Sequence, residues 1–230
     1  MARGAGGRAL ARDAREVDAL VLSCVDARDD RVVRLLTSDD ALLAAIGRQQ
    51  RRAGSRRTEE RLQPLTRIRA HVSDRPGDDL ALLQGVATTH AFATVKADLV
   101  RFALASTMAE VILATVPDGA SEPGLHDLLA RAWTWLDTPA HGPSEDVLLL
   151  FELRALTLAG ALPPVADLPG IDDRARVTLA AWLEGIWRPL APEDVRPVAH
   201  CLEGLISDAS GRPLRSRAFL DDVVRGLSGP

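Results

Sequence analysis

The sequence has very little cysteine, a single lysine, no tyrosine and no long uninterrupted hydrophobic run. Its two cysteines, Cys24 and Cys201, cannot form a four-cysteine zinc site, and they argue against a disulfide framework. The most apolar stretch, residues 99–116, contains Arg101 and Glu110 and falls short of the roughly 20 apolar residues that a membrane helix needs. Acidic residues also interrupt the N-terminal segment before a signal-peptide core can form. These absences predict a protein of the reducing cytoplasm without a membrane span.

Aromatic residues are absent from residues 1–91, and all eight of them lie between Phe92 and Phe219. Barrels that hold single-stranded nucleic acid usually stack its bases on aromatic rings, at about 1–3 kcal/mol per base. An N-terminal part without rings cannot do so. Nucleic acid bound there would be held by its backbone charge, so that any sequence is tolerated and salt weakens the complex steeply.

The composition supports a folded protein with two differently charged parts. The chain has 230 residues, of which 47% are hydrophobic and 26% charged, enough to bury a core in one large domain or two small ones. The net charge of −4 divides into +3 for residues 1–80 and −7 for residues 81–230. All basic residues except Lys96 are arginine. The change of sign predicts two parts with different partners.

Short apolar segments separated by charged turns predict a β-structure in the N-terminal part. The expected strands cover residues 17–25, 31–37, 41–47, 65–72 and 80–89. A long polar insertion, residues 48–63, separates the third strand from the fourth. Five strands with an insertion at this point are typical of an OB-type barrel. We therefore expect a flexible arm at residues 1–15 and an OB-fold domain at residues 16–90.

From residue 92 the hydrophobic period changes to that of helices. The pattern predicts six helices, over residues 95–116, 125–136, 147–159, 172–187, 193–207 and 216–226. The fold class is thus α+β, with an all-helical domain over residues 91–230. Trp133 and Trp135 stand two positions apart and must face different ways. We expect these two, with Trp182 and Trp187, to lie in the core or at its edge.

A cluster of arginines is the strongest local feature of the sequence. Six of the fourteen residues 48–61 are arginine. Guanidinium groups pair bidentately with phosphate oxygens, so this segment predicts contact with a nucleic-acid backbone. The predicted DNA-binding residues are Arg48, Arg51, Arg52, Arg56, Arg57 and Arg61, extended by Arg34 and Arg67 on neighbouring strands. The alternative is a solvated loop whose arginine content reflects codon usage.

Sequence motifs of catalysis are missing. The sequence contains no Gly-x-Ser-x-Gly and no P-loop, and its five histidines are not spaced as metal ligands on one helix. Paired acids such as Asp39 and Asp40 fall in predicted turns, where aspartate bonds to the backbone. We expect no enzymatic activity, no cofactor and no metal site. An active site assembled only in three dimensions would leave no motif, so an enzyme stays an alternative.

A second basic spot lies in residues 211–220, within the acidic part. Arg212, Arg215 and Arg217 surround the apolar start of a predicted helix. Such a spot suits an acidic peptide that ends in a hydrophobic residue. Helix capping and ordinary surface charge are the alternative.

In this order, these segments resemble the RecO family of bacterial recombination mediators. The resemblance is carried by residues 17–25, 31–37, 47–57 with Gly54-Ser55, 62–65, 99–116, 151–160 with Pro163, and 211–220. Three features depart from the family pattern. Residues 163–172 contain no cysteine, so the zinc module of many members is missing. Residues 38–41 replace a glycine-containing turn, and the basic loop has no lysine.

The resemblance implies a non-catalytic protein of the cytoplasm, associated with the nucleoid. Such a protein binds single- and double-stranded DNA, anneals complementary strands and helps to load the recombinase RecA. Its implied partners are RecR and the single-stranded-DNA-binding protein SSB, whose acidic tail ends in phenylalanine and docks on the helical domain. By position, Arg212, Arg215 and Arg217 are the candidate residues for this tail. The alternative is an interaction scaffold whose barrel binds a protein and not DNA.

Overall fold

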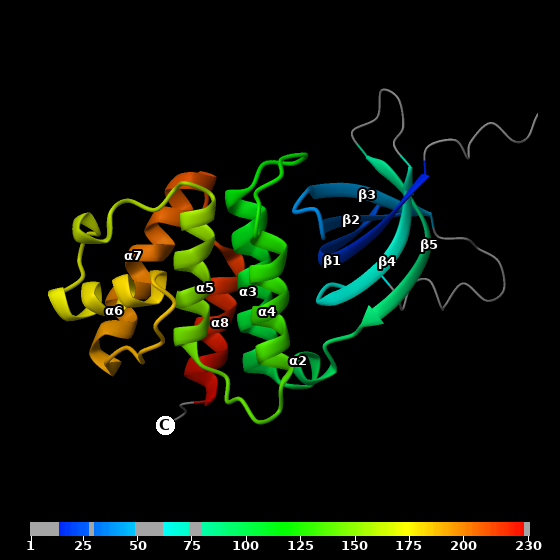
Figure 1. Ribbon diagram of the computed structural model, residues 1–230. Helices are drawn as coiled ribbons and strands as arrows, with labels where there is room; N and C mark the ends of the chain where they lie inside the picture. The colour runs from blue at the N-terminus through cyan, green and yellow to red at the C-terminus, as the bar shows by residue number, and fades with distance from the viewer. Residues whose placement is uncertain (1–13, 28–29, 49–61, 74–79, 228–230) are drawn as a thin grey trace, which may run out of the picture.

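The computed structural model describes residues 14–27, 30–48, 62–73 and 80–227. Five strands come first: β1 (Ala14–Ala27), β2 (Asp30–Thr37), β3 (Leu42–Arg48), β4 (Thr66–Ser73) and β5 (Ala81–His90). They form a closed barrel in the order β1-β2-β3-β5-β4, in which only the β3–β5 pair is parallel (Figure 1). The five predicted strands and the OB-type barrel are therefore confirmed.

Alternation of side chains explains why these segments form a barrel. In β4, the buried Ile68, Ala70 and Val72 alternate with Arg67 and Arg69, which point outward. The inward residues of all five strands meet in one apolar cluster. The long strand β1 pairs with both β2 and β4, and a register irregularity between Val21 and Ser23 lets it curve around the barrel.

The described residues that follow the barrel form helices and the connections between them. The helices are α2 (Ala93–Ala97), α3 (Leu99–Thr115), α4 (Leu125–Asp137), α5 (Glu145–Leu158), the short 3₁₀ helix η1 (Val165–Asp167), α6 (Asp173–Leu183), α7 (Pro192–Ser210) and α8 (Arg215–Leu227). All six predicted helical regions contain a helix.

Two predicted helix boundaries were wrong. The single helix expected over residues 95–116 is two helices, because Asp98 is extended and its carboxylate accepts the backbone N–H of Arg101 at 3.0 Å. That N-cap starts α3 in a new direction. The helix expected to reach residue 187 ends at Leu183, since Gly185 adopts a left-handed conformation with φ 83°.

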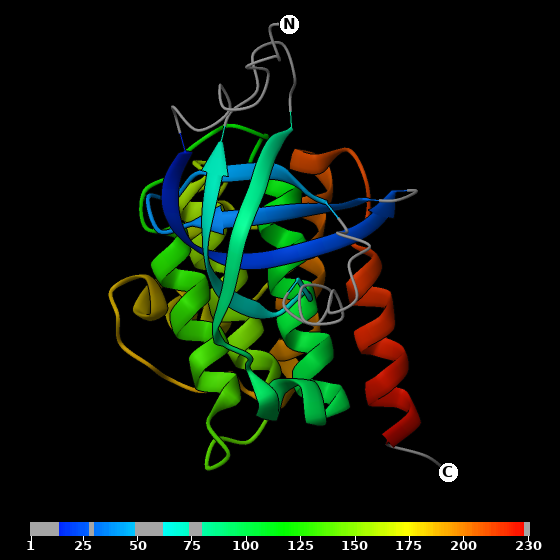
Figure 2. The ribbon, with the colours of Figure 1, turned by 90° about the vertical axis from the view of Figure 1, so that its right-hand side faces the viewer.

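The barrel and the helices share one continuous core. Leu20, Leu36, Leu42 and Leu65 of the barrel side pack into the same apolar cluster as the helices. The central helix α3 contacts α4, α5, α7 and α8, and also reaches β1. The barrel lies on the α3 and α4 side of the bundle, while α6 and α7 form the opposite side (Figures 1 and 2). This packing fixes the orientation of the barrel relative to the helices.

Carboxylates from distant segments cap three helices. Asp137 accepts the backbone N–H of Thr94 at 2.9 Å at the start of α2. Glu110 of α3 accepts the backbone N–H of Ser216 at 2.7 Å at the start of α8. Asp40, between β2 and β3, caps α4 in the same way. Such caps satisfy N–H groups that have no partner inside the helix, so they add to the packing that joins the elements.

Candidate functional sites

The arginine-rich segment leaves the barrel at the end of β3 and rejoins it before β4. Arg51, Arg52, Arg56, Arg57 and Arg61 lie outside the described residues, and Arg48 is the last residue of β3. The ends of the segment are fixed by the barrel, because Gly47 pairs with Arg31 of β2 and the Leu62 side chain is buried in the barrel cluster. A phosphate-binding segment at this position would stand on a rigid base.

The described arginine side chains of the barrel are paired with carboxylates. Arg67 of β4 contacts Asp18 of β1 at 2.7 Å, and Arg34 of β2 contacts Asp118 of the α3–α4 connection. The other pairs are Arg15–Asp39, Arg31–Asp26 and Arg69–Glu16. The described part of residues 14–92 holds six arginines and six carboxylates. The excess positive charge of the barrel therefore comes from residues 49–61, which hold five arginines and two glutamates.

The sequence suggested that Arg34 and Arg67 extend a basic surface, but in the structure both are paired with carboxylates. Both lie at the barrel surface, in the two strands that flank β1. Each is already partly neutralised by its carboxylate, so each offers a phosphate less positive charge than an unpaired arginine would. The sequence offered no signal for this, because Asp118 is 84 residues from Arg34.

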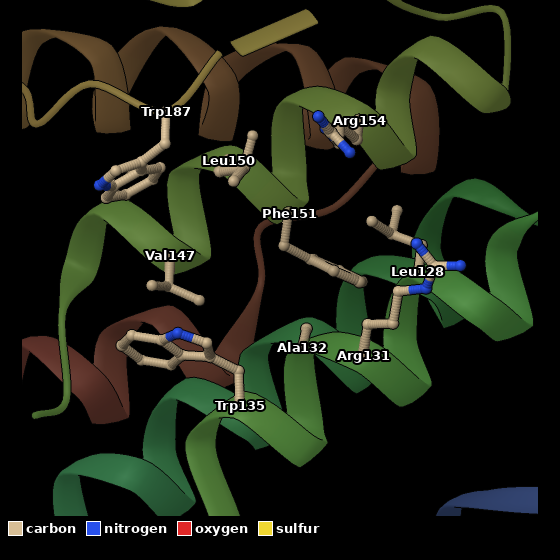
Figure 3. A pocket seen from close by; sticks show the side chains of 9 residues that line it. All are labelled: Leu128, Arg131, Ala132, Trp135, Val147, Leu150, Phe151, Arg154 and Trp187. Atoms are coloured by element: carbon tan, nitrogen blue, oxygen red, sulfur yellow. The ribbon is translucent and has the colours of Figure 1, made fainter. Parts of the chain in front are cut away.

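A second site is a pocket on the surface of the helical part, about 340 Å³ in volume (Figure 3). Its apolar walls are Leu128, Ala132, Val147, Leu150 and Phe151. Trp135 and Trp187 add two indoles, and Arg131 and Arg154 add two guanidinium groups. We call this set of nine residues the aromatic groove. Its volume lies within the range of sites that bind small ligands or single side chains.

The helical periodicity of α4 explains how the groove forms. Leu129, Trp133 and Leu136 face the core and are fully buried. The neighbouring stripe of α4, with Leu128 and Trp135, is left to face α5 and line the groove. The prediction that Trp133 and Trp135 face different ways is therefore confirmed.

The polar groups of the groove are gathered at one end. In Figure 3, Trp135 and Trp187 stand at one end, and Arg131 and Arg154 stand near Leu128 at the other. Arg154 donates from Nη2 to the backbone carbonyl of Trp182 at 2.9 Å, which fixes its guanidinium group. Arg131 is exposed and forms no ion pair within the described part of the chain. An apolar floor beside two cations suits a hydrophobic side chain that carries or adjoins a carboxylate.

Sequence reasoning missed the groove. Arg131 and Arg154 belong to different helices, and only the packing of α4 on α5 brings them together. Trp187 was expected in the core or at its edge, but 52% of it is exposed. The sequence carried no signal for the groove, because packing decides whether a tryptophan is exposed.

The structure does not gather Arg212, Arg215 and Arg217 on one surface. Arg212 and Arg215 are exposed before and at the start of α8. Arg217 is only 3% exposed and contacts Glu152 of α5 at 3.3 Å and Glu145 at 3.5 Å. Burial raises the pKa of Glu152 to about 7, and the Arg217 charge opposes this shift. Arg217 therefore joins α8 to α5 inside the molecule.

Two further features of the described residues concern metal ligands and helices that could span a membrane. Within residues 14–27, 30–48, 62–73 and 80–227, no group of three or more His, Cys, Asp or Glu side chains could hold a metal ion. Among the helices described above, none is long and apolar enough to cross a membrane.

Two family models match the chain in order. The model Recombination protein O N terminal matches residues 14–92, and Recombination protein O C terminal matches residues 96–167. The first spans the barrel and the second spans α3 to α5, including all groove residues except Trp187.

Curated relatives cover nearly the whole chain. The DNA repair protein RecO of Anaeromyxobacter dehalogenans (strain 2CP-1) is 31% identical over 250 residues, covering 92% of this chain and 97% of the relative. The protein of the same name from Myxococcus xanthus (strain DK1622) is 36% identical over 243 residues, covering 90% and 96%. Because both parts match in chain order and these relatives align over almost their full length, the chain belongs to the RecO family and has a role in DNA repair and recombination.

Proposed function

We propose that this protein is a non-catalytic recombination mediator that binds single- and double-stranded DNA, anneals complementary strands and assists RecA loading on SSB-coated DNA. The observation that carries the proposal is the arginine segment 48–61, attached at both ends to a barrel whose described arginines are already paired with carboxylates. That segment, with Arg34 and Arg67 as neighbours, is the proposed DNA contact.

Charge explains how such a contact would promote annealing. Two DNA strands repel each other through their phosphates, and this repulsion is a barrier to annealing. Several arginines on one segment lower the barrier by neutralising phosphates and releasing counterions. The barrel has no aromatic ring before Phe92 that could stack on a base. Strands held in this way keep their base edges free to pair.

The test is a salt series of DNA affinity. The test variant carries four substitutions, Arg51→Gln, Arg52→Gln, Arg56→Gln and Arg57→Gln. It should bind single-stranded DNA more weakly, and its negative slope of log K against log salt should become shallower by about 3. The matched control changes four arginines of the helical part, Arg188, Arg196, Arg212 and Arg215, to glutamine, which removes the same charge. An unchanged affinity in the first variant would favour the alternative, a scaffold whose barrel binds a protein.

For the SSB tail, we place the docking site in the aromatic groove. The phenylalanine that ends this tail suits the apolar floor, and its carboxylates suit Arg131 and Arg154 on a part of the chain with a net charge of −7. The exposed Arg212 and Arg215 are the second candidate for the same tail. The contact with RecR is supported by the family membership alone.

Binding of a synthetic SSB tail peptide separates the two candidate positions. Arg131→Gln should lower its affinity about tenfold, since a hydrogen bond to a charged group is worth about 1.5–3 kcal/mol. Arg215→Gln removes the same charge elsewhere on the helical part and should leave the affinity unchanged. The reverse result would move the tail to the start of α8. Annealing of oligonucleotides coated with intact or tail-less SSB then shows whether docking matters for function.

A further inference from the structure

Trp187 stands outside the regular helices, in the connection between α6 and α7. The chain reverses there because Gly185 is left-handed and Ile186 donates its backbone N–H to the Ala181 carbonyl at 2.8 Å. Just over half of Trp187 is exposed, yet it also lines the aromatic groove. Together with Trp135 and the apolar side chains of the groove, Trp187 forms a contiguous hydrophobic surface, the kind of surface that marks interaction sites.

The Trp187 ring is held in place from behind. It stacks on the buried Trp182, with ring centroids 5.5 Å apart and an angle of 2° between the planes. The indole N–H of Trp182 donates to the backbone carbonyl of Arg188 at 2.7 Å, so the residue after Trp187 is tied to the same support. The indole of Trp187 therefore forms a wall of the groove that is in place before any ligand binds, which lowers the entropic cost of binding.

The second indole of the groove is supported in the same manner. Trp135 stacks on His141, with centroids 4.6 Å apart and an angle of 19°. The backbone carbonyl of His141 in turn accepts a hydrogen bond from the buried Arg101. Two fixed indoles from different elements thus stand at one end of the pocket, with Val147 and Leu150 beside them (Figure 3).

One residue positions both the aromatic wall and a cation. Trp182 stacks under Trp187, and its backbone carbonyl accepts Nη2 of Arg154. A ligand that places a ring against the indoles and a carboxylate on Arg154 would therefore meet two groups with a fixed separation. A nucleobase fits less well, since the polar edge of a base would face aliphatic side chains.

We propose that Trp187 is the specificity-determining wall of the aromatic groove, selecting an acidic chain end whose terminal side chain is an aromatic ring over one of similar size that is aliphatic. Trp182 is the positioning residue for this wall. The inference rests on the proposed tail docking and adds to it a residue that lies beyond the region matched by the family models.

The experiment compares three peptides that share three aspartates and end in Phe, Leu or Ala. The full-length protein should prefer the Phe peptide to the Leu peptide about two- to tenfold, the range expected for an aromatic pair. Trp187→Leu keeps an apolar side chain and should abolish this preference, and Trp187→Phe should restore most of it. Val177→Ala, at an exposed position of α6 outside the groove, should leave the preference unchanged.

The outcomes distinguish a failure of the proposed docking site from a failure of the role assigned to Trp187. If the wild-type protein binds no acidic peptide, or Arg131→Gln has no effect on binding, the proposed docking site itself is wrong. If the peptides bind and Trp187→Leu keeps the preference for Phe, only the role of Trp187 is overturned. Displacement of the Phe peptide by oligo(dT), with loss of that competition in Trp187→Leu, would assign the wall to nucleic acid and also overturn it. Thermal unfolding of each variant confirms that it is folded.

Discussion

The carboxylate of Asp40 accepts the backbone N–H of His126 at 2.8 Å, which joins a barrel turn to the first turn of α4. The other carboxylate oxygen accepts the N–H of Gly124 at 3.0 Å. Gly124 is the N-cap residue of α4 and has no side chain to cap its own helix. Asp40 therefore does for α4 what a serine or aspartate at the N-cap would normally do.

Replacing this cap should loosen the barrel–helix junction. We expect Asp40→Ala to lower the free energy of unfolding by about 1–2 kcal/mol, the usual cost of losing a cap, measured by denaturant unfolding. Asp40→Asn is the control, because asparagine keeps an oxygen acceptor and tolerates the φ of 62° at this position. Equal stabilities of Asp40→Ala and wild type would contradict the assigned role.

The buried pair of Arg217 and Glu152 predicts a loss of stability in single variants. Arg217→Ala leaves the Glu152 carboxyl, which has no exposed surface, without its neighbouring cation. Breaking such a pair costs about 3–5 kcal/mol where the carboxyl is ionised, above pH 7, whereas replacing both partners by apolar side chains can be close to neutral. Chemical denaturation should show the large loss in Arg217→Ala and a much smaller one in Arg217→Met combined with Glu152→Met. Similar losses in both variants would argue against the pair.

The same carboxyl predicts a pH dependence of stability. Burial raises the pKa of Glu152 to about 7 in the folded protein, above the value of 4.5 for an ordinary glutamate. The folded state then binds this proton more tightly than the unfolded state, so the contribution is complete below pH 4.5 and is lost as the pH rises through 7. Glu152→Gln cannot titrate. The stability of wild type relative to Glu152→Gln should fall between pH 5 and pH 8, and a constant difference would contradict the pKa shift.

We expect Asp118 to weaken the binding of DNA phosphates by Arg34. Their ion pair is half-exposed, so it contributes little to stability, but it reduces the positive charge that Arg34 can offer to a phosphate. Asp118→Asn should therefore raise DNA affinity at low salt and steepen the salt slope by up to about 0.7–0.9, as one further phosphate contact would. Asp222→Asn releases Arg225 on α8 in the same way and should not change DNA binding. A flat response in Asp118→Asn would place Arg34 outside the DNA contact.

The sequence alone determined the element pattern and the division of charge and aromatic residues. Alternation in residues 65–72 and the three- and four-residue steps after residue 92 are local signals, because side-chain direction repeats every 2 residues in a strand and about every 3.6 in a helix. They were sufficient for the five strands and the helical regions. The absence of rings before Phe92 likewise needs no structure, since it is a property of composition.

Only the tertiary structure decided which charges are paired and where a partner could dock. The separations of Arg34 from Asp118, Arg217 from Glu152 and Asp40 from His126 range from 65 to 86 residues along the chain, so no local pattern predicts these pairs. The aromatic groove needs α4, α5 and the segment after α6 to meet, which depends on how their apolar faces pack. Periodicity fixes which face of a helix is buried, but the neighbour that covers this face, and the surface left open beside it, are settled by the packing of the whole chain.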